Sequence, residues 1–347
     1  MNYSTFTTTD NCVLAFQSSL PLATPTNPSL PPSSTSSSTT NPNTCILLLH
    51  GFSGSSAYFT RNTTPLSSSP ANHWVVCPDM RGHGRSGHNP SRGGFHVARL
   101  AADLRELLLH LRKSNALPNG SPLKVVPVGC SIGAAVVWTY LELFGETSLV
   151  ADDVELAGYV FVDQAPLQDR AALGLGGTWG AGLAHRGCFD EETMLAAQRA
   201  WMAEDAGVRK ETHRGLVGEC LGYRFAPNTS DSIGVEEAER DEEFFTGISE
   251  LCDGTWLARL LADHTRYDHR EACEGITKPV LVMAGKRSGC FSLEGMGETV
   301  RRAKSGGNED AELMVFESGH WLFYEEPERF NKELLGFVER CTKEKKK

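Results

Sequence analysis

The sequence predicts an α/β protein with a mostly parallel central sheet. Apolar runs of strand length alternate with stretches in which apolar residues recur at helical spacing, and this alternation is typical of βαβ units. One apolar run leads directly into the motif Gly129-Cys130-Ser131-Ile132-Gly133, and a helical pattern follows it. The 347 residues contain no repeat of fixed period and suffice for one large domain or two ordinary ones.

The composition is typical of a soluble globular protein. Hydrophobic residues make up 40% of the chain and charged residues 22%, so a sizeable core can be buried. Lys and Arg total 33 against 43 Asp and Glu. The formal net charge of -10 argues against a nucleic-acid partner and against electrostatic binding to an anionic membrane. No apolar run approaches the roughly 20 residues of a membrane helix.

We expect a cytoplasmic location. The first residues lack the basic start and the apolar stretch of a signal peptide. The ten cysteines follow no CxxC spacing or regular framework, and several lie in apolar runs, so they are expected to be reduced thiols. The sequence indicates no particular oligomeric state.

The chain opens with two β-like segments, residues 3–9 and 12–17, which we assign to the core as its N-terminal strands within residues 1–17. Residues 18–44 follow, and 20 of these 27 residues are Ser, Thr or Pro. Such a segment cannot bury enough apolar surface to offset the entropy lost on ordering. We therefore predict a disordered surface insertion over residues 18–44.

The remaining core elements alternate along the chain in two parts, residues 45–166 and 271–342. Apolar runs predict strands at residues 45–49, 74–77, 123–128, 158–162, 280–284 and 312–316. Apolar residues at helical spacing predict helices over residues 95–113, 132–144 and 327–341. Residues 343–347 are a short basic tail that we interpret as a solvated helix end.

Residues 167–270 interrupt this alternation. They contain no clear buried strand, and helical patterns cover residues 191–204, 208–221, 235–246 and 255–267. We predict a helical cap over the carboxyl ends of the strands, where ligands of open α/β sheets bind. Its aromatic residues either line a substrate pocket or form the core of the cap; they are Trp179, Phe189, Trp201, Tyr223, Phe225 and Trp256.

Ser131 is the leading candidate for a nucleophile. A G-x-S-x-G motif between a strand and a helix is the context that a nucleophile elbow requires, because the glycines permit a tight turn that exposes the Ser hydroxyl. The other interpretation is an ordinary Gly-rich turn. His320 follows the last predicted strand, from where its side chain can reach across the top of the sheet to Ser131. No histidine belongs to an H-E-x-x-H or similar set, so neither a metal nor a cofactor is expected.

Two other loops follow predicted strands. In His50-Gly51-Phe52, the backbone N–H of Phe52 can join that of Ile132 as a pair of oxyanion donors, and His50 is expected to brace the loop. The loop from Pro78 to Ser86 is expected to be structural. Its Asp79 is a weak candidate for a catalytic acid, because it precedes Ser131 in the chain.

These motifs, together with Asp79-Met80-Arg81-Gly82-His83-Gly84-Arg85-Ser86 and Ser318-Gly319-His320, resemble the α/β-hydrolase fold family. The resemblance runs from about residue 44 to residue 341 and is nearest to the branch of esterases, cofactor-free haloperoxidases and haloalkane dehalogenases. It implies Ser131 as the nucleophile, His320 as the general base, and the N–H groups of Phe52 and Ile132 as oxyanion donors.

The acid of the triad is where the sequence departs from the family. The usual position follows the strand at residues 280–284, but residues 285–290 contain no carboxylate, and Glu294 is expected to lie already on the next helix. A second family position is the end of the preceding core strand, where this chain has Asp163. We favour Asp163 and keep Glu294 as the alternative. Asp163 could also be a simple turn residue.

The resemblance implies a serine hydrolase that cleaves a carboxylic ester, lactone or thioester of a small to medium apolar substrate through an acyl-enzyme. The alternatives are an acyltransferase or perhydrolase on the same triad, or a ligand receptor with residual activity. Dehalogenase and epoxide hydrolase chemistry are disfavoured, because those relatives have Asp at the position of Ser131.

Overall fold

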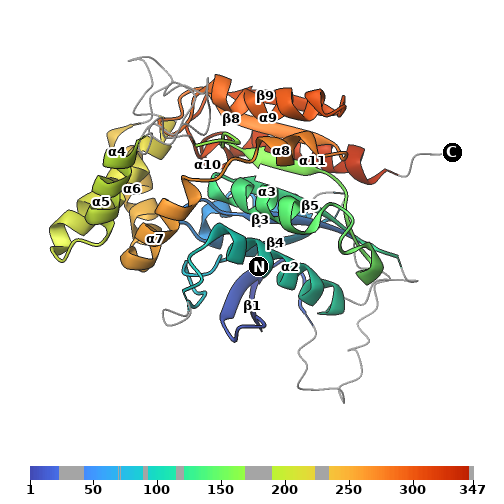
Figure 1. Ribbon diagram of the computed structural model, residues 1–347, viewed down its shortest axis with the longest axis horizontal. Coiled ribbons are helices and arrows are strands. Elements are labelled where there is room, and N and C mark those ends of the chain that lie inside the picture. Colours follow the sequence, from blue (N-terminus) through green and yellow to red (C-terminus); the bar gives the residue numbers. More distant parts are fainter. Residues whose placement is uncertain are drawn as a thin grey trace.

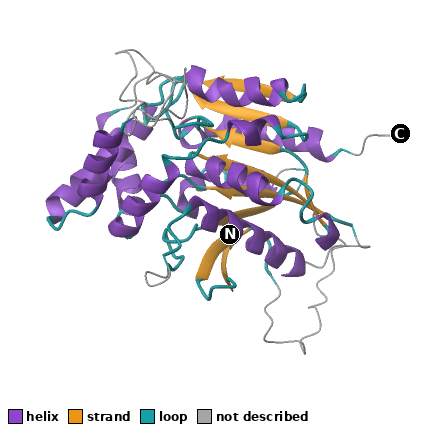
Figure 2. Ribbon diagram, in the orientation of Figure 1, coloured by secondary structure: helices purple, strands orange, loops and turns teal. Residues whose placement is uncertain are grey.

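A computed structural model describes residues 1–22, 43–68, 70, 72–88, 93–114, 121–168, 190–222 and 234–343. In this part of the chain, helices surround a central sheet, and the polypeptide alternates between the two (Figures 1 and 2). The α/β-hydrolase fold that the sequence predicts is confirmed. Of the predicted insertion and tail, residues 23–42 and 344–347 lie outside the described residues.

The described sheet has nine strands in the order β1-β2-β4-β3-β5-β7-β8-β9, with the short β6 beside β5. β1 and β4 each pair antiparallel with β2, whereas the pairs from β4 to β9 are parallel. The strands are β1 (Asn2–Thr7), β2 (Val13–Ser18), β3 (Thr44–Leu49), β4 (Trp74–Pro78), β5 (Leu123–Cys130), β6 (Val154–Leu156), β7 (Tyr159–Val162), β8 (Val280–Gly285) and β9 (Ala311–Phe316).

The centre of the sheet is buried on both faces. Every residue of β3, β4, β7 and β8 is buried, and continuous apolar runs of this kind are what a helix-covered parallel sheet requires. At the edge, β1 is mostly exposed. The helix predicted over residues 95–113 occurs as α2 (Val97–Ser114). It buries residues at helical spacing and packs beside α3 (Ile132–Phe144).

Further helices complete the two parts of the core. They are η1 (Ser56–Phe59), α1 (Thr63–Ser68), η3 (Val150–Asp152), α8 (Arg270–Glu274), α9 (Leu293–Ser305), α10 (Leu322–Glu325) and α11 (Pro327–Thr342). α9 packs on α8, β8 and β9, and α11 contacts α1 and α10. No helix among the described residues is long and apolar enough to cross a membrane.

The described residues between β7 and β8 include four helices ahead of α8. They are α4 (Glu191–Trp201), α5 (Ala206–Cys220), α6 (Val235–Ser249) and α7 (Gly254–His264). They gather at one end of the sheet, on the left in Figure 1. Three of them begin at an aspartate, Asp190, Asp205 or Asp253, whose side chain accepts a hydrogen bond from a backbone N–H of the first turn.

Several predicted boundaries were wrong by a few residues. The predicted insertion of residues 18–44 is too long at both ends, because Ser18 ends β2 and Thr44 begins β3. The first strand ends at Thr7, since Thr8 and Asn11 form the turn of a hairpin in which Asn11 has a positive φ of 62°. The sequence also missed β6 and the shortest helices, which are too short to show a period.

Candidate active site

Ser131 occupies a sharp turn between the end of β5 and the start of α3. Its φ of 52° and ψ of -125° lie in a region that residues other than glycine rarely adopt. Both flanking glycines are required, because a Cβ on Gly129 would lie 2.5 Å from the backbone nitrogen of Ala134 and one on Gly133 would lie 2.7 Å from the Leu49 carbonyl oxygen. The turn therefore presents Ser131 at the carboxyl end of the sheet, as its motif predicts.

His320 lies in the loop between β9 and α10 and is 3% exposed. Its Nδ1 is 2.5 Å from Oδ1 of Asp163, a residue that directly follows β7 and is fully buried. Asp163 also accepts hydrogen bonds from the Ser288 hydroxyl (2.7 Å) and the Gly285 backbone N–H (2.8 Å). The carboxylate is thus held from two places, the end of β8 with the loop that follows it and the loop after β9.

The electrostatics of this pair follow from burial and charge. Burial raises the pKa of Asp163, although His320, Ser288 and Gly285 all favour its ionised form. Burial lowers the pKa of His320, but the Cys290 sulfur and the Asp163 carboxylate raise it, and the net direction is upward. The protonated form of the His320 imidazole is thereby stabilised.

The structure separates the two acids that the sequence left open. Asp163 contacts His320, whereas Glu294 is exposed in the first turn of α9 and is no hydrogen-bond partner of His320 in the described part of the chain. Asp79 binds the backbone N–H groups of Ser56 (2.7 Å) and Arg85 (2.8 Å), which accords with a structural role for its loop.

His50 braces its loop through both ring nitrogens. Its Nδ1 donates to the Gly51 carbonyl oxygen (2.8 Å), and its Nε2 accepts from the Met80 backbone N–H (2.9 Å). Burial lowers the pKa of His50 to about 4, so the ring is neutral and Nε2 can act as an acceptor.

Phe52 follows this loop, and Ile132 is the first residue of α3. The N–H of a first helical residue has no acceptor within its own helix. Among the described residues, no protein acceptor is recorded for the N–H of Phe52 or of Ile132. Both N–H groups therefore remain able to bind a ligand oxygen.

A cavity of about 520 Å³ brings these residues together. Ser131, His320 and Phe52 line it from the core, and Trp201, Leu216 and Leu261 line it from the inserted helices. Within the described part of the chain, no hydrogen bond joins the Ser131 hydroxyl to His320. The cavity is nevertheless open to both side chains.

The aromatic residues predicted for the insertion divide between two roles. Trp201 lines the cavity, with its ring 5.4 Å from that of Phe52. Trp256 packs instead against His83 and Gly82 of the core. Trp179, Phe189, Tyr223 and Phe225 lie outside the described residues.

Sequence reasoning missed the groups that support Asp163. Ser288 lies in the loop after β8, where the family's usual acid is missing, and its hydroxyl binds the Asp163 carboxylate instead. A loop without a carboxylate but with a Ser at that point was the available signal. Cys220 and Cys290 were also missed; they line the cavity next to His320 although they are distant in sequence.

Comparisons with known proteins agree with this fold. The model of the Alpha/beta hydrolase family matches residues 46–333. No curated protein sequence matches the chain. Among solved structures, an esterase from Exiguobacterium antarcticum has a TM-score of 0.69 at 17% identity and covers 97% of this chain and 99% of its own.

Two further solved structures are similar. A bromoperoxidase from Bacillus anthracis has a TM-score of 0.72 at 15% identity and covers 97% of this chain and 100% of its own. A mutant N-acyl homoserine lactonase, in complex with N-hexanoyl homoserine, has a TM-score of 0.57 at 17% identity and covers 100% of this chain and 99% of its own. At such identities the likeness concerns the fold.

Proposed function

Because the chain belongs to the Alpha/beta hydrolase family, we propose that it is a serine hydrolase that cleaves a carboxylic ester, lactone or thioester of a small to medium apolar molecule. The observation that carries this proposal is the contact of His320 with the buried Asp163 beside the cavity that Ser131 lines. This arrangement supplies a nucleophile, a base and a group that orients the base.

In the proposed mechanism, Ser131 attacks the carbonyl carbon of the substrate. Since Nδ1 of His320 faces Asp163, its Nε2 is the nitrogen that accepts the Ser131 hydroxyl proton. We expect the hydrogen bond between the two side chains to form when substrate fills the cavity, because catalytic hydrogen bonds are often loose in the empty site. Asp163 then stabilises the imidazolium.

The backbone N–H groups of Phe52 and Ile132 would stabilise the oxyanion of the tetrahedral intermediate. Preorganised backbone donors of this kind cost nothing to reorient during the reaction. The His320 imidazolium next gives its proton to the leaving alcohol or thiol, and the acyl-enzyme forms. Finally, His320 activates a water molecule, which releases the carboxylic acid and restores Ser131.

The shape of the cavity supports an apolar acyl group. We propose that the inserted helices α4, α5 and α7 act as a cap, since they supply Trp201, Leu216 and Leu261 to the cavity wall. A volume of about 520 Å³ lies within the range of small-molecule pockets. Burial of the acyl chain against these side chains would also exclude water from the reacting carbonyl.

The test is hydrolysis of p-nitrophenyl esters of increasing acyl length by the wild type and by Ser131→Ala. The variant should fold normally and lose at least about three powers of ten in turnover. A fluorophosphonate should label the wild type and leave the variant unlabelled. If Ser131→Ala keeps more than about a tenth of the wild-type activity, Ser131 is not the nucleophile.

Product analysis with added alcohol or hydrogen peroxide then tests acyl transfer. A new ester in place of the free acid would indicate an acyltransferase, and a peracid would indicate a perhydrolase. This second candidate function is favoured by the likeness to a bromoperoxidase. Binding of a ligand without turnover, in the wild type and in Ser131→Ala alike, would instead indicate a receptor.

A further inference from the structure

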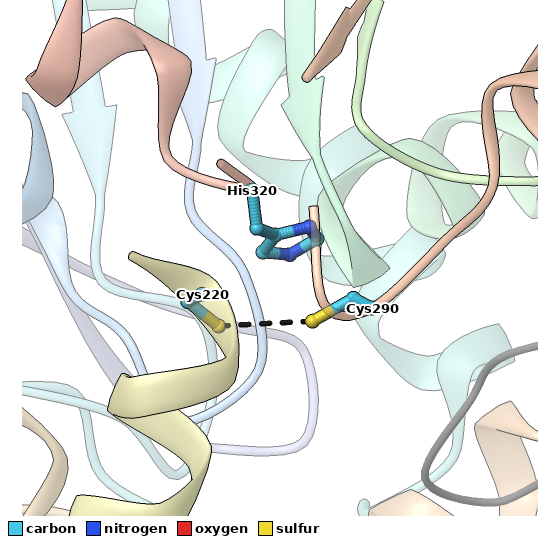
Figure 3. A group of neighbouring side chains, drawn as sticks. All are labelled: Cys220, Cys290 and His320. Carbon is cyan, nitrogen blue, oxygen red and sulfur yellow. Dashed lines mark hydrogen bonds between the residues drawn. The ribbon is translucent and has the colours of Figure 1, made fainter. Parts of the chain in front are cut away.

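We propose that Cys220, Cys290 and His320 form a binding site for Zn²⁺, and that occupation of this site reversibly inhibits the enzyme. The three side chains are buried, and one ligand atom from each lies within 4.8 Å of the others (Figure 3). They come from the end of α5, the loop after β8 and the loop after β9. The inhibition rests on the proposed function; the binding of the ion does not.

The spacing of the two sulfur atoms suits a tetrahedral zinc ion. Sγ of Cys220 and Sγ of Cys290 are 3.8 Å apart. Tetrahedral Zn²⁺ with Zn–S bonds of about 2.3 Å requires its sulfur ligands to be about 3.8 Å apart. Thiolate and imidazole ligands also favour Zn²⁺ over harder cations, which prefer oxygen ligands. The sulfur pair could therefore bind the ion without movement of the backbone.

The third ligand is already oriented for a metal. Nδ1 of His320 faces the Asp163 carboxylate, and Figure 3 shows the other side of the imidazole turned toward the two sulfur atoms. Metal-binding histidines usually donate their second ring N–H to a carboxylate in this way, which raises the basicity of the ligating nitrogen. Ser288 and Gly285 in turn fix the position of Asp163.

The cavity provides both the entry path and the fourth ligand. Cys220, Cys290 and His320 all line it, together with Ser131. On binding, each thiol releases its proton to solvent, and a protonated His320 ring also gives up the proton of Nε2. The two thiolates and Nε2 then coordinate Zn²⁺, and a water molecule completes the tetrahedron. No electron is transferred. Because Zn²⁺ then occupies Nε2, His320 cannot accept the proton of Ser131.

The binding test uses Co²⁺ as a coloured substitute for Zn²⁺ on the purified full chain, with a phosphine reductant present throughout. Tetrahedral Co²⁺ with thiolate ligands should produce a sulfur-to-metal charge-transfer band that saturates at one equivalent, and Zn²⁺ should abolish it. Cys220→Ser and Cys290→Ser should each weaken this binding by at least about tenfold. Cys341→Ser, a change of a half-buried cysteine on α11, is the matched control and should bind as the wild type does.

The activity test compares each variant with its own metal-free rate of ester hydrolysis. Zn²⁺ should inhibit the wild type and Cys341→Ser, and EDTA should restore both. In Cys290→Ser and Cys220→Ser, the half-inhibitory Zn²⁺ concentration should rise by at least about tenfold. Circular dichroism of each variant confirms folding.

The proposal is wrong if Co²⁺ gives no thiolate band, or if the two cysteine variants bind and respond to the metal as the wild type does. It is also wrong if reductant alone, and not EDTA, reverses the inhibition, because that result would identify a disulfide between Cys220 and Cys290. The Ser131→Ala variant separates the two proposals. If the wild type hydrolyses no ester but Co²⁺ still binds to the wild type and to Ser131→Ala, the proposed function fails and the metal site stands.

Discussion

Asp163 has a left-handed backbone conformation, with φ at 48°, and its carboxylate is fully buried. Asparagine tolerates this conformation and has nearly the same shape, so Asp163→Asn should fold normally. Loss of the charge removes the partner of the His320 imidazolium and selects the wrong tautomer. We expect turnover on a p-nitrophenyl ester to fall by about four powers of ten.

Glu294→Gln is the matched control for this measurement, since Glu294 is exposed on α9 and should not affect turnover. If Glu294→Gln loses its activity and Asp163→Asn stays active, Glu294 is the catalytic acid and the assignment of Asp163 is wrong. Two active variants would mean that Ser131 and His320 work without either carboxylate.

Glu325 connects the His320 loop to the inserted helices. Its Oε1 accepts hydrogen bonds from the backbone N–H groups of Gly222 (2.9 Å) and Gly319 (3.0 Å). Burial raises the pKa of Glu325 to about 7, although both N–H donors favour the ionised form. The folded protein therefore holds this proton more tightly than the unfolded chain does.

The sign of the pH dependence follows. The contribution of Glu325 to the free energy of unfolding is fully present below pH 4.5, the ordinary pKa, and is lost as the pH rises toward about 7. Glu325→Gln keeps an oxygen acceptor but cannot ionise, so its stability should fall less over this range, by about 1 to 3 kcal/mol. Urea titrations between pH 4.5 and 7.5 measure the difference. Equal slopes for wild type and Glu325→Gln, or an altered slope in the exposed control Glu328→Gln, would contradict the assignment.

At the scale of single residues, the sequence predicts the pairing of Asp163 with His320, because each follows a core strand and such strand ends converge at one edge of the sheet. The partners of Asp163 were not predictable in the same way. Ser288 donates to it across 125 positions of sequence, and such a contact has no periodic pattern.

Among the elements, the loop after β4 depends on the guanidinium of Arg81, which is fully buried. It pairs with Asp103 of α2 (2.7 Å) and with Asp10 of the β1–β2 hairpin (2.8 Å). Arg81→Met keeps much of the packing but leaves the buried Asp103 with Arg99 as its remaining cation. We expect the free energy of unfolding to fall by about 3 kcal/mol, as measured by urea denaturation.

Arg85→Met is the control for this change. Arg85 belongs to the same loop, but its side chain is exposed and lies over the ring of Tyr3. Its loss should cost less than about 1 kcal/mol. Comparable losses in the two variants would show that the loop, and not the buried pairing of Arg81, determines the stability.

Long elements with a clear period were predictable. The helix predicted over residues 95–113 is α2 (Val97–Ser114), and the predicted strands all occur. The missed elements have between three and six residues. The helix that was expected to carry Glu294 occurs as α9 (Leu293–Ser305), but its bounds were not predictable, because it exposes charged residues over much of its surface. Tertiary packing on β8 and β9 stabilises α9 more than its own apolar content indicates.

On the scale of the whole molecule, the connection between β2 and β3 should tolerate shortening. β2 runs antiparallel to β4, and β3 runs parallel to it. The end of β2 and the start of β3 therefore both lie beside the start of β4. The two ends are separated by two strand spacings, about 10 Å, which a few residues can span. Replacement of residues 23–42 by a linker of about six Gly and Ser residues should leave Tm and kcat/KM within error of the wild type.

A deletion that extends back to Ser18 is the contrasting variant. The Ser18 hydroxyl accepts a hydrogen bond from Nε1 of the buried Trp74 (2.8 Å), and Leu20 and Leu22 pack against the core. The longer deletion should therefore lower Tm by several degrees in a thermal scan. A comparable loss in the shorter replacement would show that residues 23–42 contribute to stability.

Because Asp163 precedes the inserted helices, two of the three proposed catalytic residues lie before the insertion and one lies after it. Ser131 and Asp163 both belong to residues 1–168, and His320 alone belongs to the part after the insertion, while β7 of the first part pairs with β8 of the second. A chain interrupted within the insertion would therefore have an acid without its base in one fragment and a base without its acid in the other. Ester hydrolysis by two co-expressed fragments would report, as a complementation signal, the re-formation of the β7–β8 pairing.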